Sequence, residues 1–450
     1  MKALIETRKT RPERVFLVGV EVKSRSRTGV PPVTNGQDVR AISTRDSLAE
    51  LGELAATAGG EVVGDGLQKT ESLNPATFIG KGKAAEFADF CQRQDVDTVI
   101  FDDDLSPAQS RNLEKIFNCK ILDRTSLILD IFAQRARTRE GKLQIELAQL
   151  QHLLPRLTKY WGHLSRQKGG IGMRGGEGET QLETDRRRVQ DRIAKISREL
   201  VLVRQQRGIQ RNGRQRNNWP LASIVGYTNA GKSTLLNALT GADVLVKDIL
   251  FATLDPTTRR LRLPTNQNVL LTDTVGFIRK LPHGLVEAFK ATLEEVVQAD
   301  LLLHVVDISY PQAEEQIAAV NAVLAEIGAG EKTTLMVFNK MDRLNPGGTG
   351  SGGAGALNRL QERYSHAVAI SATTGEGIAS LLAEIGTQLR PKREFLELRV
   401  PHEQAAVIAR LHQVGQVISR NYRGPAARFK ARIPPQHHDE FAPYIVTAVK

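Results

Sequence analysis

The stretch GYTNAGKST, residues 226–234, directly follows the apolar run LASIV of residues 221–225. It matches the pattern GxxxxGK[ST] of a phosphate-binding loop, whose inward-pointing backbone amides cradle phosphate oxygens. In this pattern Lys232 reaches the β and γ phosphates, and the hydroxyl of Ser233 reaches Mg²⁺. The match is significant only if a strand precedes the loop and a helix follows it. Residues 221–225 predict the strand, and residues 234–239 predict the start of the helix. We therefore expect a phosphate site here, rather than an ordinary glycine-rich turn.

A second motif, DTVG at residues 273–276, also follows a predicted strand. The carboxylate of Asp273 is placed to hold Mg²⁺ through water, and the amide of Gly276 to sense a γ-phosphate. The segment FATLD, residues 251–255, lies between the two motifs, where the first switch segment of such a protein belongs. Its Thr253 is the candidate second hydroxyl ligand of Mg²⁺. Two neighbouring hydroxyls compete for this role, those of Thr257 and Thr258.

Two further motifs concern the choice of base. Residues 333–338 predict a strand that ends in NKMD, residues 339–342. The carboxylate of Asp342 accepts two hydrogen bonds from the N1 and N2 donors of guanine, which adenine cannot supply in that arrangement. The triplet SAT, residues 371–373, again follows a predicted strand, and its backbone can meet the guanine oxygen. Four motifs in this order, each at a strand end, predict a guanine-nucleotide switch domain of the α/β class.

These motifs define the residues that we expect at the site. We expect Lys232, Thr253 and Gly276 to support catalysis, and Ser233 and Thr253 to bind the metal. The expected cofactors are GTP or GDP and Mg²⁺. Contacts with the nucleotide are expected from Gly226, Tyr227, Thr228, Asn229, Ala230, Gly231, Lys232, Ser233, Phe251, Ala252, Thr253, Leu254, Asp255, Asp273, Thr274, Val275, Gly276, Asn339, Lys340, Met341, Asp342, Ser371, Ala372 and Thr373.

The composition of the whole chain bounds its class. With 450 residues the chain exceeds what one hydrophobic core organises, so we expect about two to four domains. The formal charge of +12 favours a polyanionic partner, either nucleic acid or an acidic membrane surface. Cys91 and Cys119 lack the spacing of a disulfide framework or a zinc site. With no signal-peptide core and no apolar run of membrane-spanning length, we expect a cytoplasmic monomer.

The order of predicted elements divides the chain into regions. Alternating strands and helices at the start predict a small parallel-sheet α/β domain. Apolar residues in 4,3 spacing from Leu143, with a second seam that ends at Val203, predict a long antiparallel helical hairpin with a kink at Pro155. Near the end, a helix over residues 404–420 between two strands predicts a small α+β unit. The predicted limits are 1–137 for the N-terminal α/β domain, 138–217 for the hairpin, 218–391 for the GTP-binding domain and 392–450 for the C-terminal unit.

The connector of the hairpin is rich in glycine and arginine. Six glycines lie from Gly169 to Gly178, around Arg174. A plain linker is one interpretation, but glycine and arginine together suit a polyanion approached closely by the backbone, so we favour a tip that conforms to a partner. The second helix carries many arginines, and no acidic residue lies in residues 200–218. Because few aromatic residues lie nearby, we expect contacts with phosphate rather than stacking on bases.

Six strings can be compared with known families: NPATFIGKGK (74–83), GGIGMRGGEGETQLETDRRR (169–188), FATLDPTTR (251–259), DTVGFI (273–278), NKMD and SAT. Together they resemble the HflX family, bacterial P-loop GTPases of the translation-factor class. The resemblance implies hydrolysis of GTP to GDP and phosphate and binding to the large (50S) ribosomal subunit. It further implies GTP-dependent splitting or rescue of stalled ribosomes, especially under stress, with the helical tip reaching toward the peptidyl-transferase region.

The residue after the DxxG glycine bears on mechanism. Ras-like enzymes usually carry a water-orienting glutamine there, and this chain carries Phe277. A phenylalanine cannot orient water through a hydrogen bond. We therefore expect slow intrinsic hydrolysis, which a ribosomal partner accelerates when it orders the switch segments or supplies charge.

Two other functions stay open as alternatives. In the first, the N-terminal domain is an ATP-dependent RNA remodelling module with Lys81 and Lys83 at phosphates. Because residues 79–83 lack the GxxxxGK frame, we favour a basic helix start over a phosphate site there. In the second, the chain is a membrane-surface signalling GTPase with weak membrane association. Against it, the basic helix has no aromatic apolar face, and no lipidation motif is evident.

Overall fold

The structure is a computed structural model that forms two compact units, residues 1–382 and 383–450. Its layered strands and helices have the predicted α/β class, while the four predicted domain limits stay predictions. Among the described helices, none combines the length and the apolar character needed to cross a bilayer. The described residues are 11–22, 44–157, 177–215, 219–241, 250–251, 253–254, 256–264, 267–280, 293–344, 354–389, 394–422, 426–433 and 437–448.

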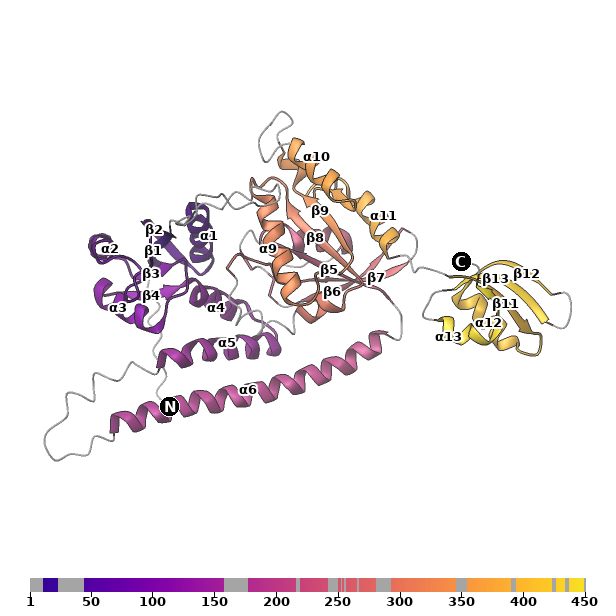
Figure 1. The fold of residues 1–450 in the computed structure, drawn as a ribbon, viewed down its shortest axis with the longest axis horizontal. Helices are drawn as coiled ribbons and strands as arrows, with labels where there is room; N and C mark the ends of the chain where they lie inside the picture. The colour runs from indigo at the N-terminus through magenta and orange to yellow at the C-terminus, as the bar shows by residue number, and fades with distance from the viewer. Residues whose placement is uncertain are drawn as a thin grey trace, which may run out of the picture. The chain divides into compact units, whose positions relative to one another are not determined.

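The N-terminal sheet is parallel, with its strands in the order β2-β1-β3-β4 (Figure 1). Successive residues of β1 point to opposite faces, so Leu17 packs with α1 and α4 while Phe16 and Val18 pack with α2 and α3. Helices therefore cover both faces, as the predicted alternation requires. The elements are β1 (Glu13–Val22), α1 (Thr44–Thr57), β2 (Gly60–Thr70), α2 (Lys81–Arg93), β3 (Thr98–Phe101), α3 (Pro107–Phe117), β4 (Lys120–Asp123) and α4 (Arg124–Arg135).

The helical hairpin consists of α5 (Arg139–Leu157) and α6 (Glu177–Gln215) (Figure 1). Leu143 of α5 packs on Ile196 and Leu200 of α6, so the two predicted apolar seams meet. Arg192 of α6 donates two hydrogen bonds to Glu146 of α5, with Nε–Oε1 and Nη2–Oε2 distances of 2.7 and 2.8 Å. The apolar contact holds the two antiparallel helices together. The bidentate ion pair beside it fixes the position of one helix along the other.

Some predictions about the hairpin are not tested. Pro155 lies inside α5 close to its C-terminal end, where its missing amide removes one helical hydrogen bond. The predicted kink at this residue stays a prediction. Residues 158–176, which include most of the glycine-rich tip, lie outside the described residues.

The nucleotide-binding sheet has the strand order β10-β9-β8-β5-β7-β6, and its neighbouring strands are parallel except β6 and β7. The sequence did not predict β6, because its TTRRLR run has a single apolar residue and so lacks the apolar pattern of a strand. In the structure only Leu261 of this run is buried, as is usual for a charged edge strand. The carboxyl ends of β5, β7, β9 and β10 therefore meet at one edge of the sheet. The elements are β5 (Leu221–Gly226), α7 (Lys232–Thr240), β6 (Thr257–Arg262), β7 (Asn268–Asp273), β8 (Leu301–Asp307), α9 (Ala313–Glu326), β9 (Thr334–Asn339), the short helix η2 (Met341–Arg343), α10 (Ala354–Arg363), β10 (Ala367–Ala369) and α11 (Ile378–Gln388).

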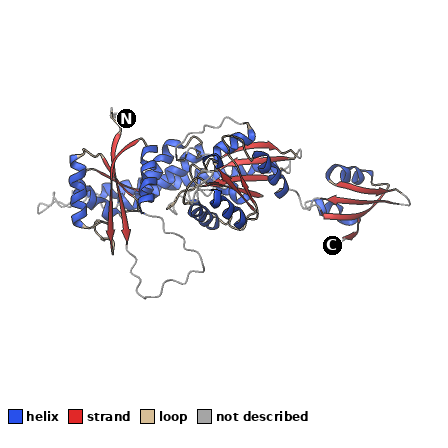
Figure 2. Ribbon diagram, turned by 90° about the horizontal axis from the view of Figure 1, so that it is seen from above, coloured by secondary structure: helices blue, strands red, loops and turns tan. Residues whose placement is uncertain are grey.

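The C-terminal unit has an antiparallel sheet in the order β12-β13-β11-β14 (Figure 2). The predicted helix over residues 404–420 is wrong in its second half, since α12 ends at Val414 and a strand follows. A Cβ at Gly415 would lie 2.9 Å from the carbonyl oxygen of Leu411, so this glycine lets the chain turn away from the helix. The β-branched Val417 and Ile418 then favour a strand. The elements are β11 (Glu394–Pro401), α12 (Ala405–Val414), β12 (Gln416–Asn421), β13 (Ala426–Ile433), α13 (His438–Phe441), the short helix η4 (Ala442–Tyr444) and β14 (Ile445–Ala448).

A buried arginine supports the N-terminal domain and yields a stability prediction. Arg124, 2% exposed, forms ion pairs with Glu50 and with Asp102, the latter at 2.7 Å. Replacement of Arg124 by Met would take the buried cation from the carboxylates of Glu50 and Asp102, and it would leave Asp102 with only the half-exposed Lys280 as a charged partner among the described residues. We expect a loss of roughly 3–5 kcal/mol in the free energy of unfolding. Urea denaturation followed by circular dichroism measures it.

The control for this prediction is Arg11→Ala. Arg11 pairs with Asp95 at 2.6 Å, but both side chains are exposed, so solvent screens their attraction. The denaturation midpoint of this variant should stay close to that of the parent chain. Equal midpoints for the Arg124 and Arg11 variants would contradict the structural role of Arg124.

Candidate nucleotide-binding site

The loop between β5 and α7 depends on two glycines. Gly226 has φ +150° and Gly231 has φ +92°, in the region that side-chain-bearing residues rarely adopt. A Cβ at Gly226 would collide with the carbonyl oxygen of Val305, and one at Gly231 with the side-chain amide of Asn339. The predicted strand–loop–helix context is confirmed, and it brings the NKMD motif against the phosphate loop.

Lys232 lies buried at the start of α7. Its Nζ donates a hydrogen bond of 2.6 Å to the carbonyl oxygen of Tyr227 in the same loop. Burial lowers the pKa of Lys232 to about 8, an effect that the nearby carboxylate of Asp273 opposes. A Cβ at Gly276 would lie 3.1 Å from this Nζ, so the DTVG backbone also runs close to the lysine. A buried cation whose hydrogen bond, among the described residues, goes to a neutral carbonyl is well placed to bind an anion.

Two hydroxyls and one carboxylate gather beside this lysine. The Oγ of Ser233 lies 2.7 Å from the Oγ1 of Thr253 and donates a hydrogen bond of 2.7 Å to Oδ2 of Asp273. Asp273 is fully buried, burial raises its pKa, and its Oδ1 has no hydrogen-bond partner among the described residues. Hard oxygen donors and an unsatisfied buried carboxylate oxygen suit Mg²⁺, so these residues fit that ion.

The competing hydroxyls lie elsewhere. Thr257 and Thr258 belong to β6, and the hydroxyl of Thr258 is 3.0 Å from that of Thr272. The structure therefore brings Thr253, rather than Thr258, to Ser233.

The base-recognition motifs are joined through one asparagine. Asn339 donates from Nδ2 to the carbonyl oxygen of Ala230 at 2.9 Å, and its Oδ1 accepts from the amide of Ala372 at 3.0 Å. Lys340, at φ +65°, forms an ion pair of 2.7 Å with Asp307. Asp342 follows in η2 with its side chain exposed. The NKMD and SAT loops are thus held against the phosphate loop, with the carboxylate free to meet a base.

Some predicted contact residues use their side chains for packing. Tyr227, Phe251, Leu254 and Val275 belong to a buried apolar cluster. Thr274 donates from its hydroxyl to the carbonyl oxygen of Ile224 at 2.6 Å. These residues keep only backbone atoms for a nucleotide. The remaining described members, Thr228, Asn229, Met341, Ser371 and Thr373, lie on the same loops, while Ala252 and Asp255 lie outside the described residues.

Phe277 is fixed behind the phosphate loop. Its amide donates to the carbonyl oxygen of Gly226 at 3.1 Å, and its own carbonyl oxygen accepts from the amide of Thr228 at 2.8 Å. The phenyl ring is 3% exposed within the apolar cluster. The side chain therefore neither carries a polar group nor reaches solvent, in agreement with the expectation that it does not orient water.

Sequence reasoning missed the contacts of these loops with the N-terminal domain. The hydroxyl of Tyr227 donates to Glu50 of α1 at 2.5 Å, and the ring of Phe251 packs on Phe132 of α4 with centroids 4.6 Å apart. Lys280, just after DTVGFI, binds Asp102 at 2.7 Å. These partners are far apart in sequence, and no local pattern marks them.

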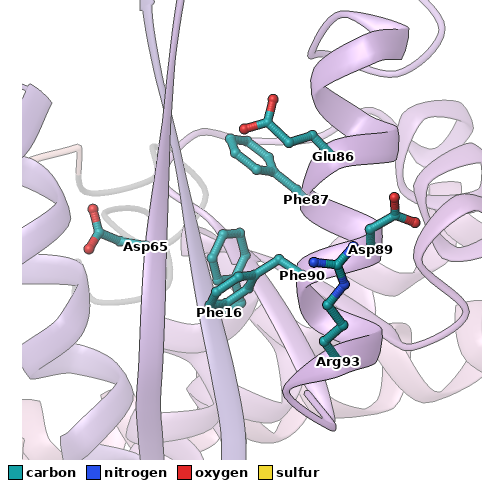
Figure 3. A pocket seen from close by; sticks show the side chains of 7 residues that line it. All are labelled: Phe16, Asp65, Glu86, Phe87, Asp89, Phe90 and Arg93. Carbon is teal, nitrogen blue, oxygen red and sulfur yellow. The ribbon is translucent and has the colours of Figure 1, made fainter.

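The second phosphate site considered in the N-terminal domain has unsuitable surroundings. Helix α2 begins at Lys81, which agrees with the favoured interpretation of a basic helix start. The amide of Gly80 already donates a hydrogen bond of 2.9 Å to Oε1 of Gln68. Lys83 is paired with Glu86 at 2.7 Å. The cavity of about 360 Å³ next to α2 (Figure 3) combines aromatic rings with carboxylates that would repel phosphate, and its lining is Phe16, Asp65, Glu86, Phe87, Asp89, Phe90 and Arg93.

Three protein families match successive parts of the chain. They are described as GTP-binding GTPase N-terminal at residues 45–133, GTP-binding GTPase Middle Region at 135–214 and 50S ribosome-binding GTPase at 222–340. The last match contains the phosphate loop, the DTVG motif and the first two residues of NKMD.

Relatives match most of the chain. The GTPase HflX of Caldanaerobacter subterraneus subsp. tengcongensis is 47% identical over 402 residues, which cover 89% of this chain and 91% of the relative. That of Escherichia coli K12 is 48% identical over 377 residues, 84% of this chain and 87% of the relative. A solved GTP-binding protein of Sulfolobus solfataricus in complex with GDP is 24% identical, with 84% of this chain and 98% of that chain covered and a TM-score of 0.42. The nucleotide motifs are assembled at one sheet edge, and the two HflX proteins are 47% and 48% identical over most of the chain. The chain therefore belongs to the HflX family of GTPases.

Proposed function

We propose that this GTPase binds the large ribosomal subunit in the cytoplasm and couples GTP binding and hydrolysis to the splitting of stalled ribosomes under stress. The observation that carries the proposal is the basic surface of α6, where Arg186, Arg187 and Arg188 are exposed. Helix α6 ends at Gln215 and β5 begins at Leu221, so the basic helix leads almost directly into the phosphate loop. The description of the matched GTPase family, 50S ribosome-binding, supports the same partner.

The residues of the site divide the work on GTP. Lys232 exchanges the carbonyl of Tyr227 for the β and γ phosphates, which are stronger partners for a buried cation. Ser233 and Thr253 would hold Mg²⁺, with Asp273 behind them, and the bound ion supplies positive charge that offsets charge developing on the phosphates. The amide of Gly276 senses the γ-phosphate.

The base end of the site supplies selectivity. Asn339 keeps the NKMD and SAT loops in place, and Asp342 accepts hydrogen bonds from guanine. Together with the phosphate end, this arrangement makes the conformation of the switch segments depend on GTP rather than on ATP.

The metal cluster yields the second prediction. Ser233→Ala removes one hydroxyl from the predicted metal site, so the gain in GTP affinity on adding Mg²⁺ should fall by roughly 10- to 100-fold. Titration of a fluorescent non-hydrolysable GTP analogue, with excess Mg²⁺ and with a chelator, measures it. Thr258→Ala is the matched control, because that hydroxyl faces Thr272 instead. An unchanged Mg²⁺ effect in the Ser233 variant would remove this residue from the metal site.

The buried position of Phe277 yields the third prediction. The isolated chain should hydrolyse GTP slowly, because no side chain at this position orients water. Purified large subunits should raise the rate at least roughly tenfold, whereas small subunits serve as the control. Phosphate release under single-turnover conditions measures the rates. A rate that large subunits leave unchanged would overturn ribosome stimulation.

The basic surface of α6 yields the fourth prediction. Replacement of Arg186, Arg187 and Arg188 by Ala should weaken binding to large subunits by roughly tenfold at physiological salt, and it should flatten the salt dependence. Co-sedimentation with the non-hydrolysable GTP analogue and with GDP measures the affinity.

The matched control removes three exposed basic residues from the N-terminal domain, Arg93, Lys115 and Lys120. This N-terminal control variant carries the same change of net charge and should bind normally. If the α6 variant instead lost binding to acidic vesicles and kept its affinity for subunits, the membrane alternative would replace the ribosomal one.

A further inference from the structure

The C-terminal unit has one helix-covered face and one open face. Its elements run β11–α12–β12–β13–α13–β14, and the strand order β12-β13-β11-β14 is that of a β-α-β-β-α-β fold. Strand β13 alternates strictly, with Phe429 and Ala431 buried on the side that packs with Leu411 of α12 and Phe441 of α13. The residues between them point to the opposite side. Among the described residues of this unit, the helices α12 and α13 pack on the first face, and no helix covers the second.

The open face is basic. The exposed residues of β13 are Arg428, Lys430 and Arg432. On the neighbouring strand β11, Arg399 lies directly opposite Arg428 and is also exposed. Lys430 is opposite Glu397, and the two form an ion pair of 2.7 Å. This pair leaves three arginines on the face.

The arrangement of Arg399 and Arg428 is unfavourable without a partner. Like charges directly opposite each other on antiparallel strands destabilise a sheet. In the described part of the chain, neither guanidinium forms an ion pair with an acidic side chain. The carboxylate of Glu397 on this face is already paired with Lys430, and Asp439 and Glu440 lie on α13 in the helical layer. The open face therefore keeps a net positive charge, which favours a polyanion that would neutralise both arginines.

The chemistry of the face favours phosphate over bases. Four-stranded sheets of this topology bind RNA in RRM domains, where exposed aromatic side chains stack on bases. Here the corresponding strands carry arginine and lysine, and Phe395, opposite Arg432, is half-buried. Arginine forms bidentate hydrogen bonds with phosphate, and such contacts depend little on sequence.

We propose that the open face of the C-terminal sheet binds the phosphate backbone of RNA, as a second RNA-binding surface besides α6. The proposal goes beyond ribosome splitting and does not depend on it, since binding to free RNA can be measured without ribosomes. The contacts come from Arg399, Arg428 and Arg432, with Lys430 shared between Glu397 and the RNA.

The test compares full-length proteins in binding to a labelled oligouridine by fluorescence anisotropy. The sheet variant carries Arg399→Gln, Arg428→Gln and Arg432→Gln, and the control carries Gln at Arg93, Lys115 and Lys120. The dissociation constant of the sheet variant should rise by roughly tenfold, and the slope of log K against log salt should shrink by about 2, as expected for three lost phosphate contacts on a single strand. The control should keep the parental slope.

Equal affinity and slope in the two variants would overturn the proposal, provided that basal GTP hydrolysis shows both chains to be folded. The proposal would also be overturned if the sheet variant lost binding to polyglutamate but kept binding to RNA. An acidic protein, rather than RNA, would then be the partner of the open face. Loss of RNA binding with intact ribosome splitting would support the proposal and separate it from the proposed function.

A second measurement does not depend on the arginine variants. Ser419 is exposed on β12 and lies opposite Lys430, whereas Asp439 is exposed on α13. A photoreactive phenylalanine analogue at position 419 should cross-link to the oligouridine, and the same group at position 439 should not. Cross-linking of equal yield at both positions would show that the open face has no preference for RNA.

Discussion

The site depends on one steric constraint, the close passage of the phosphate loop past two neighbouring strands. At Gly226 the loop runs against the carbonyl of Val305, and at Gly231 against the amide of Asn339. Because neither position has room for a Cβ, the loop packs directly on β8 and on the end of β9, which carries the NKMD motif. The hydrogen bond from Asn339 to Ala230 is possible only at this distance. Phosphate recognition and base recognition are therefore parts of one packed structure.

The polar groups enclosed by this packing explain why the site requires ligands. Lys232 is buried with a lowered pKa, and Asp273 is buried with a raised one and an unsatisfied oxygen. Buried charges without full compensation cost free energy, which a phosphate and a cation would recover on binding. A nucleotide and a cation would thus complete the charge arrangement of these described residues.

Local patterns in the sequence predicted the parts of the fold whose signals are local. The four motifs, their strands and the seam around Leu143 required only spacing and residue type. The strand β2 is harder to predict from sequence, because Gly64 and Gly66 are typical of residues that interrupt a strand. In the structure a Cβ at Gly66 would lie 2.6 Å from the ring of Phe87, so this position requires glycine. The reason for these glycines is a helix distant in sequence. In the same way, the error over residues 404–420 arose at Gly415, whose role depends on a contact with Leu411.

Contacts between the nucleotide-site loops and the N-terminal domain are the part of the site that the sequence did not predict. Tyr227 of the phosphate loop binds Glu50, which also binds the buried Arg124, and Phe251 of the first switch segment packs on Phe132. These loops cannot change conformation without altering contacts with the N-terminal domain. By thermodynamic linkage, any nucleotide that favours one loop conformation also changes the free energy of those contacts, and a partner bound to the N-terminal domain changes nucleotide affinity by the same factor. These few side chains would couple any partner of the N-terminal domain to recognition of the γ-phosphate, and no single stretch of sequence reveals their pairing.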